Sequence, residues 1–197
     1  YQAGDYDLAG FCVGAVEKDE IIDGSTVVSG DVLIGLASSG LHSNGFSLVR
    51  HVLSNTGSSL SDEFNGSAFI DTLLEPTRIY IKPVLNLLKS VQLKAISHIT
   101  GGGLLENLPR IMPADTQAKV NDESWHWPPV FEWLMENGNI DQQEMYRTFN
   151  CGVGLVLIVA AEQADETISL LNELGEQAWH LGEIEPLADG PQVIFTK

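Results

Sequence analysis

Residues 35–50 join an apolar strand, a turn of small polar residues and an amphipathic helix, and this junction constrains the fold most. The strand is predicted over 32–37 and the helix over 44–54, with Ser, Gly, His and Asn between them. The first N–H groups of a helix lack partners within the helix, and its macrodipole is positive there, so such a turn can bind an anion. The same Ser and Asn residues could instead cap the helix, and the segment alone leaves both interpretations open.

The composition favours a globular protein and argues against several classes of partner. With 197 residues, 44% of them apolar, the chain can bury a core in one domain. It has no run of about 20 apolar residues that could span a membrane. Its net charge of −17 argues against binding to nucleic acid or to an anionic membrane. A small phosphorylated ligand is compatible with this charge, since backbone amides and a few local cations can neutralise it.

The two cysteines, Cys12 and Cys151, lie far apart in apolar segments typical of strands. We expect both to be buried free thiols in a reducing compartment, and we therefore expect a cytoplasmic protein. Neither cysteine belongs to a metal-binding spacing such as Cys-x-x-Cys, and the sequence has no His-Glu-x-x-His motif. We predict no metal site in this chain.

Strands and helices alternate along the chain and predict a mixed sheet with helices packed on it and hairpin-like pairs at both ends. The expected strands cover 8–17, 32–37, 94–99, 117–120, 155–159, 177–184 and 192–196. The expected helices cover 44–54, 77–91, 104–112, 128–137, 141–146 and 162–174. Pro83 predicts a kink or a later start in the second helix. The polar stretch 55–66 is the best candidate for a loop or an insertion.

Two further turns concentrate small and polar residues. Residues 98–103 lie between a strand and a helix, and residues 147–154 lead from a polar loop into a strand. The three glycines of the first turn would let the backbone approach a bulky anion, although a structural turn would also explain them. They match neither the phosphate loop nor the dinucleotide motif. His42 and His98 lie at two of these turns, and each is either functional or an ordinary hydrogen-bonded histidine.

Basic and aromatic residues give weaker signals. Arg78 and Lys82 are expected on one helix face and could act together on a phosphate. Trp125 and Trp127 could stack on a ligand, but packing of a loop against the domain is the favoured interpretation. Most of the cations could also be surface ion pairs. The candidates that could meet a phosphate are Arg50, Arg78, Lys82, Arg110 and Arg147.

Five segments together resemble one known family. They are 5–11 (DYDLAGF), 16–24 (VEKDEIIDG), 38–50 (SSGLHSNGFSLVR), 98–103 (HITGGG) and 147–152 (RTFNCG). In this order they are similar to the C-terminal half of the aminoimidazole ribonucleotide synthetase family, also called phosphoribosylformylglycinamidine cyclo-ligase. The resemblance covers essentially the whole chain. It implies an α+β fold, with a mixed β-sheet flanked by helices in partly ferredoxin-like α/β/α layers.

The resemblance implies a role in purine biosynthesis, in which formylglycinamidine ribonucleotide is cyclised to aminoimidazole ribonucleotide while ATP is hydrolysed to ADP and phosphate. Members of the family are two-domain homodimers with the active site between the domains, and their N-terminal half supplies most contacts to ATP and Mg²⁺. That half has no counterpart here. Residues 1–7 would be a remnant of the interdomain linker, residues 8–197 would be the C-terminal domain, and the chain alone would be inactive.

The resemblance also suggests which residues form the site. His42 and His98 are the candidates for acid–base catalysis. The candidates for binding substrate or phosphate are Ser38, Ser39, Gly40, Ser43, Asn44, Gly45, Thr100, Gly101, Gly102, Gly103 and Asn150. The alternative interpretations are a ligand-binding domain without catalysis and a related ATP-using enzyme such as selenophosphate synthetase or thiamine-phosphate kinase.

Overall fold

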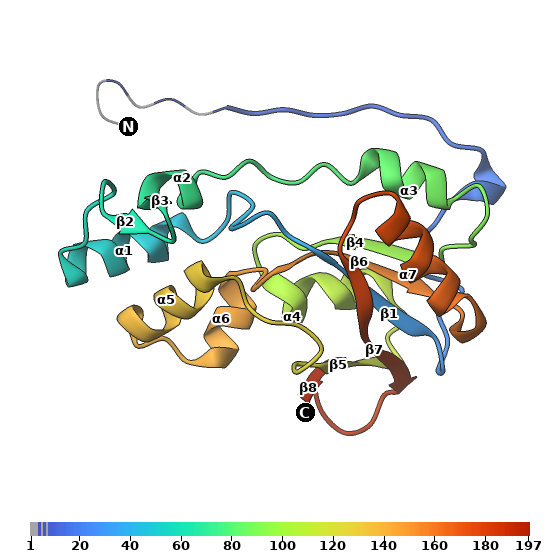
Figure 1. Ribbon diagram of the computed structural model, residues 1–197. Helices are drawn as coiled ribbons and strands as arrows, with labels where there is room; N and C mark the ends of the chain where they lie inside the picture. The colour runs from blue at the N-terminus through green and yellow to red at the C-terminus, as the bar shows by residue number, and fades with distance from the viewer. Residues whose placement is uncertain (1–3, 5, 7) are drawn as a thin grey trace.

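The computed structural model describes residue 4, residue 6 and residues 8–197 of the chain. Its centre is a six-stranded sheet with the strand order β4-β6-β1-β7-β5-β8 (Figure 1). Neighbouring strands are antiparallel except for β5 and β8, so the sheet is mixed. The strands are β1 (Val32–Ala37), β4 (Ala95–His98), β5 (Thr116–Asn121), β6 (Val153–Val159), β7 (Ala178–Pro186) and β8 (Val193–Thr196).

Helices cover both faces of this sheet, because its central strands carry apolar side chains on both sides. Leu33 of β1 belongs to a core that α4 (Gly103–Asn107) and the 3₁₀-helix η2 (Leu108–Ile111) complete. The next residue, Ile34, belongs to the core on the other face, under α3 (Ile81–Leu87) and α7 (Ala164–Glu173). The expected arrangement of a mixed sheet between helices is confirmed.

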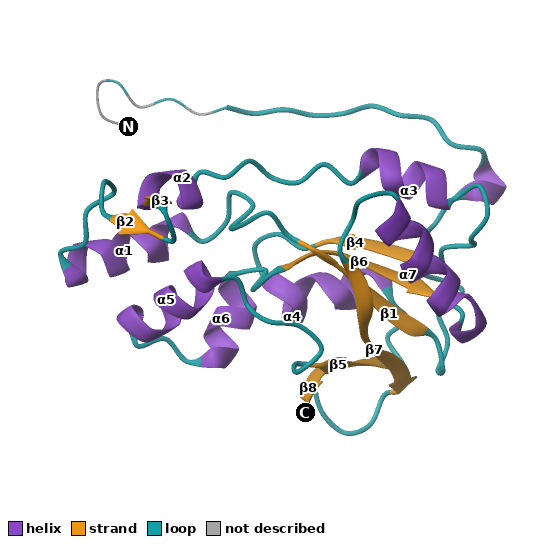
Figure 2. Ribbon diagram, in the orientation of Figure 1, coloured by secondary structure: helices purple, strands orange, loops and turns teal. Residues whose placement is uncertain are grey.

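A third core lies beside the sheet, where α1 (Phe46–Thr56), α2 (Phe69–Leu73), α5 (Pro129–Gly138) and α6 (Gln142–Thr148) pack around Phe131 and Phe149 (Figure 2). The stretch 55–66, expected as a loop, contains the end of α1 and the first strand of a small hairpin. This hairpin is formed by β2 (Glu63–Phe64) and β3 (Ser67–Ala68). None of the helices in the described part of the chain has the length and apolar character needed to cross a membrane.

The prediction of a strand over 8–17 is wrong. This segment runs extended along one side of the domain without joining a sheet (Figure 1), and the side chain of Phe11 is 96% exposed. An apolar strand needs neighbours that cover it, and the described residues provide none there. The expected burial of Cys12 is wrong for the same reason, whereas that of Cys151 is confirmed.

Four smaller expectations also need correction. The helix expected over 77–91 is the shorter α3, with Pro83 in its first turn, where the missing N–H has no helical partner to lose. Arg78 lies before this helix, so the prediction that it shares a helix face with Lys82 is wrong. The helix expected over 104–112 consists of α4 and η2. Finally, β7 and β8 do not form a hairpin, because β5 lies between them.

Candidate functional site

The three polar loops singled out in the sequence meet at one edge of the sheet. Strand β6 lies between β4 and β1 and is antiparallel to both, so the ends of β4 and β1 adjoin the start of β6. Leu155 of β6 faces both Leu36 and His98 in register. The loops 38–45, 98–103 and 147–153 therefore gather between the sheet and the helical cluster (Figure 2).

Asn150 links two of these loops. Its side-chain Oδ1 accepts hydrogen bonds from the Ser38 hydroxyl at 3.0 Å and from the Gly152 N–H at 2.8 Å. Its Nδ2 donates to the Gly40 carbonyl at 2.8 Å. The residue is 2% exposed, so these bonds form away from water, where an unpaired amide would be costly. Asn150 thus holds the turn after β1 against the approach to β6.

His42 is buried inside the first loop. It is 3% exposed, and its Nε2 accepts the backbone N–H of Ser39 at 3.0 Å and that of Arg78 at 3.3 Å. Burial, together with smaller contributions from the nearby charges of His98 and Arg78, lowers the pKa of His42 to about 4. Because two N–H groups point at Nε2, the neutral ring carries its proton on Nδ1. This arrangement makes His42 a fixed acceptor that shapes the loop.

His98 and Tyr80 complete a small group of rings around His42. The ring centroids of His42 and His98 lie 5.9 Å apart, and Tyr80 lies 6.2 Å from each. The Tyr80 hydroxyl donates to the Ala37 carbonyl at 2.7 Å, and burial raises the pKa of this phenol above its usual value. His98 is exposed at the end of β4, and partial desolvation of its ring lowers its pKa. Of the two histidines, His98 is the one that solvent or a ligand can reach.

The absence of a side chain at Gly154 allows this grouping. A Cβ placed there would overlap the Tyr80 hydroxyl and would lie 2.7 Å from Cε1 of His42. Such contacts are shorter than side chains tolerate, so either ring would have to move. Sequence reasoning placed Gly154 in a candidate loop but did not predict this close approach, which depends on the facing strand.

The triple-glycine turn is held by Asn107, a residue that sequence reasoning missed. Its Nδ2 donates to the carbonyls of Gly103 at 2.8 Å and Gly101 at 3.3 Å. Gly102 and Gly103 have φ of 97° and 54°, the left-handed region that glycine adopts without strain. The signal that could have indicated this role is an Asn inside the helix predicted over 104–112, since the Asn side chain competes for nearby backbone groups.

The first two loops also touch each other, and they leave a helix N-terminus free of side-chain caps. Asn44 donates to the His42 carbonyl at 2.7 Å, and its Oδ1 lies 3.4 Å from where a Cβ of Gly101 would be. The N-cap of α1 is Gly45, with no hydrogen bond from a capping side chain. Ser43 is exposed and, like His42, has a positive φ. The interpretation that Ser and Asn merely cap this helix is therefore not supported.

The basic residues are less well placed for an anion. Arg78 donates through Nε to Glu176 at 2.7 Å, and Glu176 is 9% exposed. Arg110 of η2 makes an exposed ion pair with Glu106 of α4, and Arg147 makes one with Glu144 within α6. Such exposed pairs contribute little to stability. Arg78 lies beside the first loop, where its N–H bonds to His42, and it lines a pocket of about 480 Å³ together with Tyr80 and His98.

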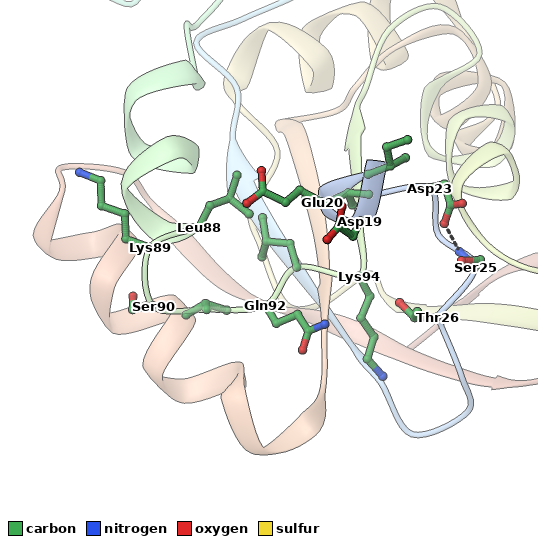
Figure 3. Close-up of a pocket in the computed structure, with 14 residues that line it drawn as sticks. Asp19, Glu20, Asp23, Ser25, Thr26, Leu88, Lys89, Ser90, Gln92 and Lys94 are labelled. Carbon is green, nitrogen blue, oxygen red and sulfur yellow. Dashed lines mark hydrogen bonds between the residues drawn. The ribbon is translucent and has the colours of Figure 1, made fainter. Parts of the chain in front are cut away.

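A second pocket of about 480 Å³ lies beyond the C-terminal end of α3, between residues 19–26 and 88–94 (Figure 3). Asp19, Glu20 and Asp23 lie along it, and Asp23 accepts the N–H of Ser25 at 2.9 Å. Lys94 donates to the buried Asp31 at 2.6 Å, so its charge is already compensated. This pocket contains none of the residues that the sequence suggested for the site.

The fold and the loops define an α+β domain of the AIR synthase-like superfamily. The family model described as AIR synthase related protein, C-terminal domain, matches residues 28–190, and the chain belongs to this family.

The solved structures of similar fold belong to proteins with different names. Thiamine-monophosphate kinase from Stenotrophomonas maltophilia K279a matches with a TM-score of 0.58 and 19% identity, over 85% of this chain and 50% of the other. Hydrogenase maturation protein HypE in complex with ATP matches with a TM-score of 0.63 and 17% identity, over 91% of this chain and 51% of the other. T. maritima PurL complexed with AMPPCP matches with a TM-score of 0.52 and 13% identity, over 87% of this chain and 24% of the other. The chain spans about half the length of the first two, and at these identities the likeness establishes the fold alone.

Proposed function

We propose that this chain is the C-terminal domain of an ATP-dependent cyclo-ligase that converts formylglycinamidine ribonucleotide to aminoimidazole ribonucleotide, ADP and phosphate. The observation that carries the proposal is the convergence of loops 38–45 and 98–103 beside Asn150, in a member of the AIR synthase related family. The motifs Ser-Ser-Gly-Leu-His-Ser-Asn-Gly and Arg-Thr-Phe-Asn-Cys-Gly favour the cyclo-ligase over other members.

The loops suit an anionic substrate in spite of the acidic composition of the chain. An uncapped helix N-terminus at Gly45 and the glycine backbone at 101–102 offer N–H groups, which bind phosphate oxygens without needing a cation. The N–H of Gly103 is already bonded to the Thr100 carbonyl at 3.0 Å. These donors are held in place by Asn107 and Asn150, so little ordering is needed when a ligand binds. We assign the ribose phosphate of the substrate to this loop pair.

In the proposed reaction, ATP phosphorylates the formyl oxygen, which then leaves as phosphate when a nitrogen of the amidine closes the ring. ATP and Mg²⁺ would supply this activation from a separate N-terminal half, with residues 1–7 as linker and 8–197 as the domain described above. The described loops would position the substrate and stabilise charge on the transferred group. His98, exposed beside the loops, is the candidate for accepting the proton that the attacking nitrogen releases.

Calorimetry on the chain tests the substrate. Formylglycinamidine ribonucleotide should bind, and Asn44→Ala should weaken binding about tenfold, because Asn44 lies where the two loops meet. Asn55→Ala, an exposed change on α1, is the matched control and should leave the affinity unchanged. The second candidate is a thiamine-phosphate kinase domain, because the fold is similar to that of thiamine-monophosphate kinase. Tighter binding of thiamine monophosphate than of formylglycinamidine ribonucleotide would favour this second candidate over the proposal.

A turnover assay tests the division of labour. The 197-residue chain should release no ADP and form no aminoimidazole ribonucleotide, whereas a longer product of the same gene that includes an ATP-binding half should do both. Cyclisation by the chain alone would refute the proposed dependence on a second domain. Substrate binding without turnover in the longer protein would support a domain that has lost catalysis.

A further inference from the structure

A third pocket lies beside the start of the loop 38–45. Its volume is about 370 Å³, and its lining residues include Ser38 and Gly152, the two groups that donate to Oδ1 of Asn150. The pocket therefore adjoins the loop 38–45 at its first residue, Ser38. Its remaining walls come from the loop 124–128 and from the start of β7.

Two tryptophans form an aromatic wall in this pocket. The rings of Trp125 and Trp179 are stacked, with centroids 6.4 Å apart and planes 29° from parallel, and each keeps part of its surface exposed. The indole N–H of Trp125 donates to the Cys151 carbonyl at 2.9 Å, which fixes the orientation of this ring. Pro128 lies beside the tryptophans as a third flat, apolar surface.

The indole of Trp179 is not explained by hydrogen bonding. Its Nε1 is buried against Gly35 and has no partner in the part of the chain that the structure describes. A buried indole N–H usually has a partner, and leaving it unpaired is costly. A phenylalanine would avoid that cost, so the large ring face of the indole is the property that this position uses.

The chemistry of the pocket favours a flat, uncharged ligand group. Apart from the exposed imidazole of His126, the described residues that line it carry no titratable side chain, so the pocket lacks the group of charged side chains that holds a phosphate or a metal ion. Ser124 and Gln177 supply polar side chains at its rim, where they can bond the edge of a ring whose faces lie on indole and proline. This combination of stacking surfaces and rim polar groups is typical of heteroaromatic ring recognition.

We propose that this pocket, lined by Trp125, Trp179 and Pro128, binds the heteroaromatic ring of a ribonucleotide whose phosphate lies in the loops 38–45 and 98–103. The identity of the ring rests on the proposed function, under which it is the imidazole of the product. Stacking on the tryptophans would then hold the ring only after it has closed, because the open-chain substrate has no aromatic face.

Three probes separate the pocket from the loops: aminoimidazole carboxamide ribonucleotide, its riboside without phosphate, and ribose phosphate without a ring. Two substitutions block the pocket from opposite walls, Ser124→Phe and Gln177→Phe, both at positions outside the core. Gln143→Phe, on the exposed side of α6, is the matched control. Thermal unfolding of each variant confirms that it folds.

In calorimetry, the ribonucleotide should bind the unmodified chain at least tenfold more tightly than ribose phosphate. Both blocking variants should abolish this preference and leave ribose phosphate binding unchanged, and Gln143→Phe should retain it. Equal affinities for the two phosphates in the unmodified chain, or a preference that survives both blocking variants, would overturn the pocket. Riboside binding that the blocking variants abolish would support the pocket even if formylglycinamidine ribonucleotide fails to bind, so the two proposals can fail separately.

Discussion

Replacing Asn150 by Ala tests whether one buried amide holds the loops of the candidate site together. The substitution removes three hydrogen bonds, to the Ser38 hydroxyl, the Gly152 N–H and the Gly40 carbonyl. A net contribution of about 1 kcal/mol for each bond gives a loss of about 3 kcal/mol in the free energy of unfolding. Water cannot take the place of the amide, because Gly40 and Gly152 are buried.

Urea denaturation followed by tryptophan fluorescence measures this loss by linear extrapolation. Ser38→Ala removes a single bond and leaves Oδ1 of Asn150 paired with Gly152, so it should cost about 1 kcal/mol or less. Asn55→Ala removes an exposed amide from α1 and should change stability by less than about 0.5 kcal/mol. A loss below about 1 kcal/mol for Asn150→Ala would refute the reasoning, since the three bonds would then not act as buried bonds.

Three other perturbations follow from the same region. Stability should fall by up to about 3 kcal/mol as the pH drops from about 6.5 to about 4, because burial lowers the pKa of folded His42 to about 4 while the unfolded chain binds the proton near its ordinary pKa. Urea titrations at several pH values in this range should show that the free energy of unfolding of His42→Gln changes less steeply with pH. An unchanged pH dependence would count against a lowered pKa of His42. Trp125→Phe should cost about 1–2 kcal/mol in urea denaturation because it removes a bonded N–H, whereas Trp179→Phe should stay within about 0.5 kcal/mol because its N–H has no partner among the described residues. Gly154→Ala should destabilise the chain by about 1–3 kcal/mol, since the new methyl would overlap a tyrosine hydroxyl; a thermal unfolding temperature equal to that of the unmodified chain would contradict this.

The strands of the sheet could be predicted from local patterns, whereas the convergence of the loops depends on the order of the strands. The apolar run 153–159 and the alternation of strands and helices predict a layered sheet, and the polar turns follow its strands. Side chains that follow adjoining strands at one edge must lie close together, which is why His42, His98 and Asn150 share a region. From the sequence, the grouping of these loops followed only from the family resemblance, because the local pattern does not give the strand order.

The segment 8–17 shows where such patterns fail. Its apolar residues satisfy the local preference for a strand, but a strand also needs partners for its backbone groups and a surface to cover its side chains. Neither is supplied to this segment by the described residues. A single sequence carries no information on whether a strand's partner belongs to the same domain.

Contacts across the sheet were also beyond sequence reasoning. Tyr80 reaches the Ala37 carbonyl, and Asn107 reaches the triple-glycine turn, through side chains whose partners depend on the fold. Gly154 could be recognised as a glycine before a strand, but its need for close approach arises from Tyr80 and His42 on other elements. These residues carry ordinary local signals, and only packing gives them a role.

The environments of the two histidines argue for different roles in one site. With a pKa of about 4, roughly one His42 ring in a thousand is protonated at pH 7, and its Nε2 already accepts two backbone N–H groups. A proton taken up at Nε2 would break those bonds and release the turn before α1, so proton transfer at His42 would disturb the loop it shapes. His98 is exposed and lies 5.9 Å from His42 by ring centroids. We therefore infer that His42 positions the loop and that any proton transfer in this region falls to His98. His98→Gln should then lower turnover in a protein that carries the ATP-binding half while leaving the affinity for substrate unchanged, and a loss of affinity without a change in the rate constant would contradict this division.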